Sequence, residues 1–207
     1  MTQVNKERML AEFKEIVALP CHSLQERPVF ELLKGKLEAL GFTVEEDDAG
    51  EKLGGNCGNL WAFLPASAGV EGAVRVLLSA HMDGVEPCGG TTVIQKDGVL
   101  YSDGTTILGG DDKSGVEGIL EGIRLLLEEG APHGDIQILF TVCEEGGVNG
   151  SRCLDRSKLR ADVMHWTVKA LRARLLSALP ARRNIKSISS AEPRMADWSR
   201  KRALTPL

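Results

Sequence analysis

The sequence predicts an α/β fold in which a mixed, mostly parallel β-sheet carries helices on both faces. Two short apolar runs, at residues 74–80 (VRVLLSA) and 135–143 (DIQILFTVC), have the length and composition of buried strands. Between them, residues 111–127 carry an apolar stripe at helical spacing, and Gly130 closes this helix. Strand, helix and strand in this order indicate a βαβ unit with parallel strands.

The elements before this unit are predicted from local patterns. Apolar residues recur at helical spacing over residues 6–19, and Pro20 ends that pattern. A second helix is expected over residues 28–40, because its apolar residues share one face and Gly41 follows as a natural C′ residue. Short strands are expected at residues 42–46 and 59–64. Residues 91–101 are expected to form a hairpin, because Lys96-Asp97-Gly98 carries a turn signal.

Composition excludes several classes of protein. The 207 residues are 43% hydrophobic, enough for one sizeable core, and a net charge of −4 gives no sign of a nucleic-acid partner. No stretch approaches the roughly 20 apolar residues of a membrane span, and the first residues lack a signal peptide's apolar region. Five cysteines without a CxxC pair favour reduced thiols. We therefore expect a soluble, cytoplasmic protein without a membrane partner.

Acidic residues are concentrated where predicted strands or glycine turns end. They lie in His81-Met82-Asp83, in Gly109-Gly110-Asp111-Asp112-Lys113 and in Glu144-Glu145. Ligands of parallel sheets gather beyond the carboxyl ends of the strands, so the fold should bring these clusters to one edge. One imidazole and several carboxylates suit divalent metals with a carboxylate base beside them. The sequence therefore proposes metal-assisted hydrolysis.

Each cluster also has an ordinary structural interpretation. His81 could have no role beyond capping a strand end through hydrogen bonds. On an extended segment, however, it could also bind a metal while Asp83 steadies it. Asp111 and its neighbour could only cap the following helix, although the preceding glycines allow a close backbone approach. Glu144 and Glu145 could be a solvated loop, and both can reach one site only if the chain turns there. If all three ordinary interpretations held, three unrelated acidic clusters would meet at one sheet edge by coincidence, whereas a single metal site explains all of them.

Three motifs together resemble the M20 zinc peptidases, and the nearest branch looks like the tripeptidase T group. The motifs are residues 79–83 (SAHMD), 108–115 (LGGDDKSG) and 141–146 (TVCEEG), within a likeness covering about residues 5–163. The resemblance implies a three-layer zinc-peptidase catalytic domain of the phosphorylase/hydrolase-like type. Residues 1–163 would be its N-terminal part, and the domain would be incomplete in this chain.

The resemblance also implies a role for each site residue. His81 would bind one of two Zn²⁺ ions, Glu145 the other, and Asp111 would bridge both, with Co²⁺ or Mn²⁺ as alternative metals. Glu144 would be the catalytic base, and Asp83 would support the first metal site. The implied reaction removes the N-terminal residue of a short peptide, and an intact member can form a homodimer. Related branches instead cleave C-terminal residues or acyl-amino acids.

The sequence departs from the family pattern after the third motif. A further aspartate ligand, a distant final histidine and a lid domain are implied by the family, and none is evident. A second hypothesis is therefore an inactive remnant that binds one metal weakly or binds a partner. For this 207-residue chain we expect little or no activity.

Residues 164–207 differ in composition from the rest of the chain. They contain no glycine and have a charge balance of +8, against −12 for residues 1–163. Read from the last base of the Met164 codon, the codons through Thr167 force Ala-Leu-Asp, which looks like the family segment with the absent aspartate. We therefore interpret residues 164–207 as an out-of-frame, poorly ordered tail. The competing interpretation is an amphipathic basic helix over residues 168–179 for a membrane surface or a partner.

Overall fold

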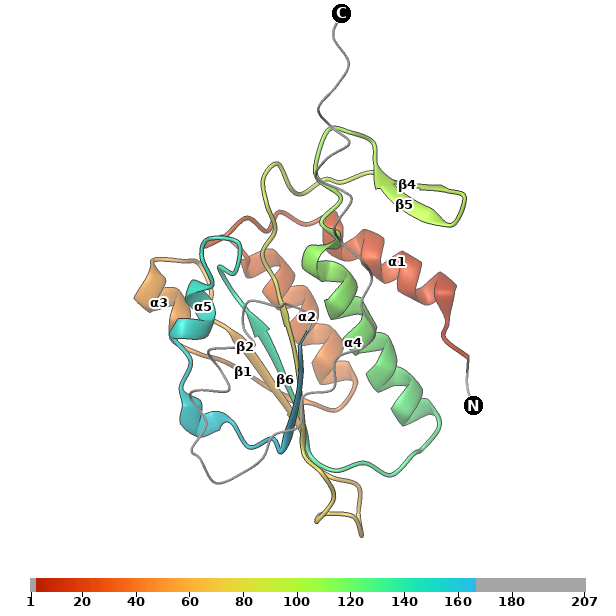
Figure 1. The fold of residues 1–207 in the computed structure, drawn as a ribbon, viewed down its shortest axis with the longest axis vertical. Coiled ribbons are helices and arrows are strands. Elements are labelled where there is room, and N and C mark those ends of the chain that lie inside the picture. Colours follow the sequence, from red (N-terminus) through yellow and green to blue (C-terminus); the bar gives the residue numbers. More distant parts are fainter. Residues whose placement is uncertain (1–2, 167–207) are drawn as a thin grey trace, which may run out of the picture.

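The computed structural model describes residues 3–166, and a five-stranded sheet forms their centre (Figure 1). Its order is β1-β2-β6-β3-β7. The strands are β1 (Thr43–Glu46), β2 (Leu60–Leu64), β3 (Val76–His81), β6 (Ile136–Thr141) and β7 (Val163–Trp166). β2 is antiparallel to β1 and β6, whereas β3 is parallel to β6 and β7. Four strands therefore run in one direction and β2 opposes them, so the prediction of a mixed, mostly parallel sheet is confirmed.

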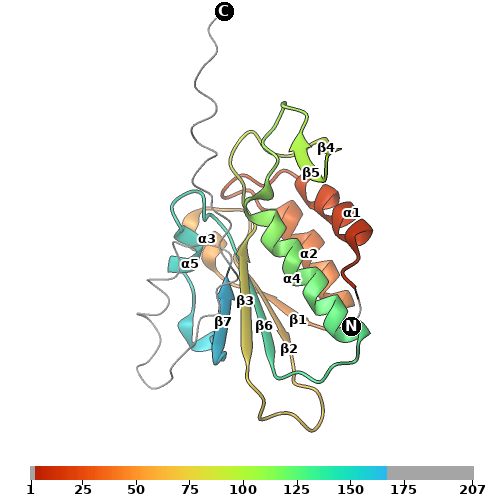
Figure 2. The ribbon, with the colours of Figure 1, turned by 45° about the vertical axis from the view of Figure 1, so that its right-hand side comes forward.

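Three long helices lie together on one face of this sheet (Figure 2). They are α1 (Lys6–Val17), α2 (Arg27–Ala39) and α4 (Gly110–Glu128), close to the bounds that the apolar periodicity predicts. Pro28 occupies the first turn of α2, and Gly41 follows that helix at φ +88°. In β6, Ile138 and Phe140 point into the main core with these helices, because alternate strand residues face opposite sides.

The opposite face carries only short helices within the described residues. Trp61, Leu77 and Leu139 form a second apolar cluster there with Leu154 and Met164. The chain between β6 and β7 contains α5 (Asn149–Arg152) and the 3₁₀ turn η1 (Arg156–Lys158). Like α3 (Ala49–Leu53), these helices are too short to show a helical period, which is why the sequence patterns did not predict them.

A hairpin is inserted between β3 and α4 and lies away from the main sheet (Figure 1). It consists of β4 (Val93–Lys96) and β5 (Val99–Ser102), and its turn is the predicted one. Asp97 and Gly98 both have positive φ values, of 51° and 77°. Two such residues match the right-handed twist of the strands, which explains the Asp-Gly pair at this position.

Strand β7 runs across the boundary that the composition suggests between residues 163 and 164. Met164 is buried in the second apolar cluster and pairs with Leu77 of β3. The remainder of the predicted tail, residues 167–207, lies outside the described residues, as does the alternative helix at 168–179. Among the described residues, no helix combines the length and apolarity needed to cross a bilayer.

Candidate active site

The pairing of β3 with β6 determines where the motif residues meet. The two strands are parallel and in register from Val76 opposite Ile136 to His81 opposite Thr141. Their carboxyl ends therefore coincide, and the segment after Thr141 leads directly to Glu144 and Glu145. The N-terminus of α4 reaches the same edge. This topology brings together residues that lie more than 60 positions apart, as expected for a parallel sheet.

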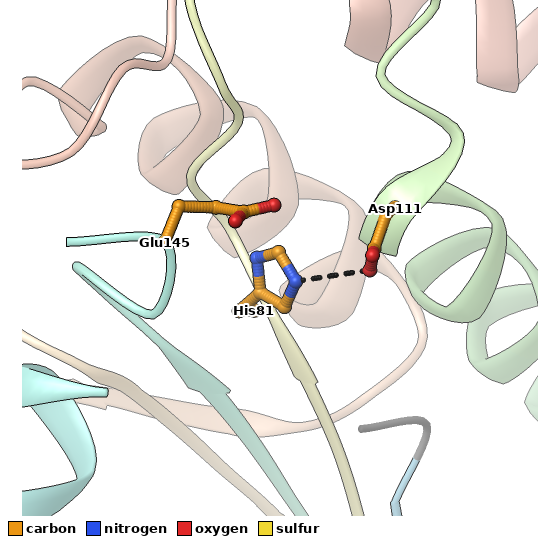
Figure 3. Close-up of side chains that lie close together, drawn as sticks. All are labelled: His81, Asp111 and Glu145. Carbon is orange, nitrogen blue, oxygen red and sulfur yellow. Dashed lines mark hydrogen bonds and ion pairs between the residues drawn. The ribbon is translucent and has the colours of Figure 1, made fainter. Parts of the chain in front are cut away.

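His81 is at the centre of the cluster and is 1% exposed (Figure 3). Its Nδ1 lies 3.2 Å from Oδ1 of Asp83 and 3.2 Å from the backbone oxygen of the same residue. Its Nε2 lies 3.3 Å from Oδ1 of Asp111 and 4.0 Å from Oε2 of Glu144. One ring nitrogen therefore fixes the orientation of the imidazole while the other faces the acidic groups.

Asp111 lies in the first turn of α4 but does not cap this helix. Gly109, at φ +75°, is the N-cap residue, and no side chain makes a capping hydrogen bond there. Asp111 has extended backbone angles (φ −92°, ψ 109°), and its peptide bond with Asp112 is cis. Its side chain is 69% exposed and points toward His81 (Figure 3). The geometry thus favours the ligand interpretation of Asp111 over the capping one.

Glu144 and Glu145 reach the same site because the chain turns immediately after β6. Cys143 has a positive φ of 50°, and the backbone oxygen of Glu144 accepts hydrogen bonds from Gly147 and Val148. Glu145 extends toward the imidazole from above the strand end (Figure 3). The turn that two adjacent carboxylates require is therefore present.

His81, Asp111 and Glu145 form the one metal-compatible group found among residues 3–166. One nitrogen of His81 and one oxygen of each carboxylate all lie within 4.8 Å of one another. Two ligands of one Zn²⁺ ion are at most about 4.3 Å apart, so small side-chain rotations would suffice to share an ion. One buried imidazole and two carboxylates accessible from solvent are also a donor set that Zn²⁺ accepts. The residues present therefore fit a divalent metal.

The electrostatics of this group favour a positive charge at its centre. Burial opposes ionisation of His81, but hydrogen bonds with Asp111 and Asp83 prevail and raise its pKa to about 10. The hydrogen bond with His81 lowers the pKa of Asp111. Burial raises the pKa of both Glu144 and Glu145, although His81 opposes this. A cation placed among these carboxylates would stabilise their charged forms.

Similarity to known proteins agrees with this arrangement. A model of peptidase family M20/M25/M40 matches residues 77–179, which include all three motifs. YqjE, an uncharacterised protein of Bacillus subtilis (strain 168), is 39% identical over 158 residues, which are 76% of this chain and 42% of YqjE. The solved structure of aminopeptidase PepT from Bacillus cereus has a TM-score of 0.76 at 39% identity, covering 79% of this chain and 43% of PepT.

The chain belongs to the M20 peptidase family. A tripeptidase structure from Staphylococcus aureus is also similar, with a TM-score of 0.75 at 37% identity, covering 80% of this chain and 44% of the tripeptidase. The chain spans less than half the length of these relatives.

Asp83 has a larger structural role in this M20 chain than steadying His81. It is fully buried, and its Oδ1 accepts the backbone N–H of Glu144 at 3.0 Å. Its Oδ2 accepts the N–H of Glu145 at 3.0 Å and the hydroxyl of Ser23 at 2.6 Å. Burial raises the pKa of Asp83, but hydrogen bonds with His81 and Ser23 outweigh it and hold that pKa below its usual range. Asp83 therefore connects the ends of β3 and β6.

Three supporting residues were not predicted from the sequence. Lys113 is 1% exposed, and its Nζ donates to the backbone oxygen of Asp83 at 2.6 Å. Ser23 and Glu26 lie directly before α2. The hydroxyl of Ser23 donates to Asp83, and Oε1 of Glu26 accepts the backbone N–H of Cys143. Lys113 lies within the recognised motif at residues 108–115, which is the one sequence signal that could have indicated its role. Ser23 and Glu26 are polar residues before a helix, a position that in sequence alone suggests local capping, although no side chain caps α2.

Proposed function

We propose that this chain is the N-terminal part of the catalytic domain of a metal-dependent peptidase that hydrolyses short peptides, of the aminopeptidase or tripeptidase type. One observation carries the proposal: ligand atoms of His81, Asp111 and Glu145 converge within 4.8 Å, and Oε2 of Glu144 lies 4.0 Å from Nε2 of His81. The similarity to PepT and to the tripeptidase supports a short peptide as the substrate.

Each residue would have a distinct task. His81, Asp111 and Glu145 would hold Zn²⁺, and Asp111 would share a second Zn²⁺ in the two-metal form that the motifs imply. Zn²⁺, when bound, acts as a Lewis acid that polarises a peptide carbonyl and lowers the pKa of water. Asp111 suits the shared position because its side chain is 69% exposed and projects from a turn rather than from a regular helix.

Glu144 would be the general base. Its side chain is 13% exposed and its Oε2 is 4.0 Å from Nε2 of His81, so it borders the proposed metal position. Burial raises its pKa toward the pH at which a base exchanges protons efficiently. It would take a proton from water and pass it to the leaving amine. The hydrogen bond from its own backbone N–H to Asp83 fixes its position.

A second candidate is a remnant that binds one metal weakly without catalysis. The number of ligands favours this candidate, because the metal-compatible group among residues 3–166 has three members. A two-metal site needs more ligands than these three can supply.

Hydrolysis of a tripeptide in the presence of Zn²⁺ separates the two candidates. The peptidase proposal predicts turnover that Glu144→Gln abolishes while Zn²⁺ affinity changes by less than about threefold. Glu51→Gln, an exposed acid on α3, is the matched control and should alter neither quantity. Turnover unchanged by Glu144→Gln would remove Glu144 as the base. Weak binding of one metal with no turnover would favour the remnant.

A further inference from the structure

Three consecutive backbone amides after β6 are bound by two buried carboxylates. The N–H of Cys143 donates to Oε1 of Glu26 at 2.9 Å. The N–H groups of Glu144 and Glu145 donate to the two oxygens of Asp83, each at 3.0 Å. The segment that presents the proposed base and a proposed metal ligand is thus held by its backbone.

Glu26 is not a member of the metal group, and it is fully buried. Its Oε1 accepts a second hydrogen bond, from the N–H of Leu24 at 2.9 Å, whereas its Oε2 has no hydrogen-bond partner among residues 3–166. A buried carboxyl group with one oxygen unsatisfied carries a free-energy cost that packing alone does not explain. Such a residue in a native structure calls for a specific role.

The backbone at Cys143 explains why an anchor is needed. Its φ of 50° is left-handed, a conformation that side-chain-bearing residues adopt only at a cost. The turn is also crowded, because Gly146 lies against the side chains of Cys143 and Ser23. Ser23 in turn donates to Asp83. Residues 23–26 and Asp83 therefore enclose the turn from two sides.

We infer that Glu26 is a positioning residue for the site: its Oε1 holds the amide of Cys143 and thereby sets the direction in which Glu144 and Glu145 leave the strand. Glu26 itself is set by the first turn of α2, where its backbone oxygen accepts the N–H of Phe30 at 2.9 Å. The anchor is thus connected to the helical layer rather than to a loop alone. The consequence for metal binding rests on the proposed function, whereas the anchoring of the turn does not.

Amide hydrogen exchange of the metal-free chain tests the anchoring directly. The amides of residues 143–145 should exchange about 10- to 100-fold more slowly than unprotected amides, since their acceptors are carboxylates. Glu26→Asp withdraws the acceptor by about 1.5 Å, the length of one carbon–carbon bond, and should accelerate exchange at Cys143. Unprotected amides at residues 143–145 in the wild-type chain would overturn the inference.

Co²⁺ binding tests whether the anchor matters to the site. Glu26→Asp keeps the charge but moves the acceptor, and Glu26→Gln keeps an acceptor oxygen but loses the charge. Positioning predicts that Glu26→Asp weakens Co²⁺ affinity about tenfold or more and shifts the visible spectrum of the bound ion. Glu26→Gln should stay within about threefold of the wild type and keep its spectrum.

Glu117 on α4 supplies the matched control, because it is also a buried glutamate, and its carboxyl oxygens have no hydrogen-bond partner within the described part of the chain. Glu117→Asp and Glu117→Gln should leave the Co²⁺ spectrum unchanged. A wild-type spectrum and affinity in Glu26→Asp, or equal losses in both Glu26 variants, would overturn the positioning role. If Glu26→Asp does not fold, amide hydrogen exchange at residues 143–145, measured in the wild type and in Glu26→Gln, tests the positioning role instead. Absence of Co²⁺ binding to the wild-type chain would instead refute the proposed metal site.

Discussion

Replacing Asp83 with asparagine should destabilise the fold strongly, although the two side chains have nearly the same shape. Asp83 uses both oxygens: Oδ1 accepts from the amide of Glu144, and Oδ2 accepts from the amide of Glu145. Asparagine has only one acceptor oxygen, and its NH₂ group must then face a backbone N–H or the ring of His81. No rotation of the amide group satisfies both contacts.

The expected loss follows from this count. A hydrogen bond to a charged acceptor contributes about 1.5–3 kcal/mol, and at least one such bond disappears. The favourable contact between Asp83 and Nδ1 of His81 at 3.2 Å is weakened as well. We therefore expect Asp83→Asn to lower the free energy of unfolding by roughly 2–4 kcal/mol.

Urea denaturation of the metal-free chain measures this difference. Asp103→Asn is a matched control, because Asp103 accepts from the N–H and the hydroxyl of Thr105 through the single oxygen Oδ1, which asparagine retains. Asp103 is exposed, and its substitution should cost less than about 0.5 kcal/mol. An Asp83→Asn protein as stable as the control would refute the claim that Asp83 joins the two strand ends.

Two further predictions concern stability. Burial, reinforced by Glu12, raises the pKa of Glu117 to about 8, so the folded state keeps a proton that the unfolded chain releases near pH 4.3. Stability should therefore fall as pH rises between these values, and Glu117→Gln should remove that decline; parallel curves of thermal midpoint against pH for both proteins would contradict this. In Gly150→Ala the new methyl group would clash with the backbone oxygen of Val142, costing about 1–3 kcal/mol or more. Gly118→Ala in α4 meets open space and should stabilise by about 0.5–1 kcal/mol, so equal denaturation midpoints for the two alanine variants would contradict the packing.

The predictions that came directly from the sequence concern segments with strong local patterns. The apolar runs of β3 and β6 and the stripe of α4 identify a parallel unit, because buried strands and amphipathic helices differ in period. Once the unit is parallel, its topology places His81 and Glu144 at one edge without further information. The glycine turns at Gly41 and Gly98 likewise follow from residue type, since both have positive φ.

The remaining features depend on contacts between distant segments, which a single sequence does not reveal. Glu26 precedes a helix and resembles a capping residue, yet its acceptor oxygen serves Cys143, 117 positions away. Cys143 adopts a left-handed backbone that its residue type disfavours. For the same reason, the sequence alone does not decide whether Asp111 caps the helix or binds a metal. Tertiary hydrogen bonds, not local propensity, determine all three.

Zn²⁺ titration of the wild-type chain beside single-ligand variants tests the central claim most directly. If His81, Asp111 and Glu145 share a cation, then His81→Ala, Asp111→Asn and Glu145→Gln should each weaken Zn²⁺ affinity at least about tenfold, while Glu51→Gln leaves it unchanged. A competition assay with a chromophoric chelator at pH 7 measures these affinities. Equal affinity in all five proteins would show that the convergence of the three side chains does not bind metal.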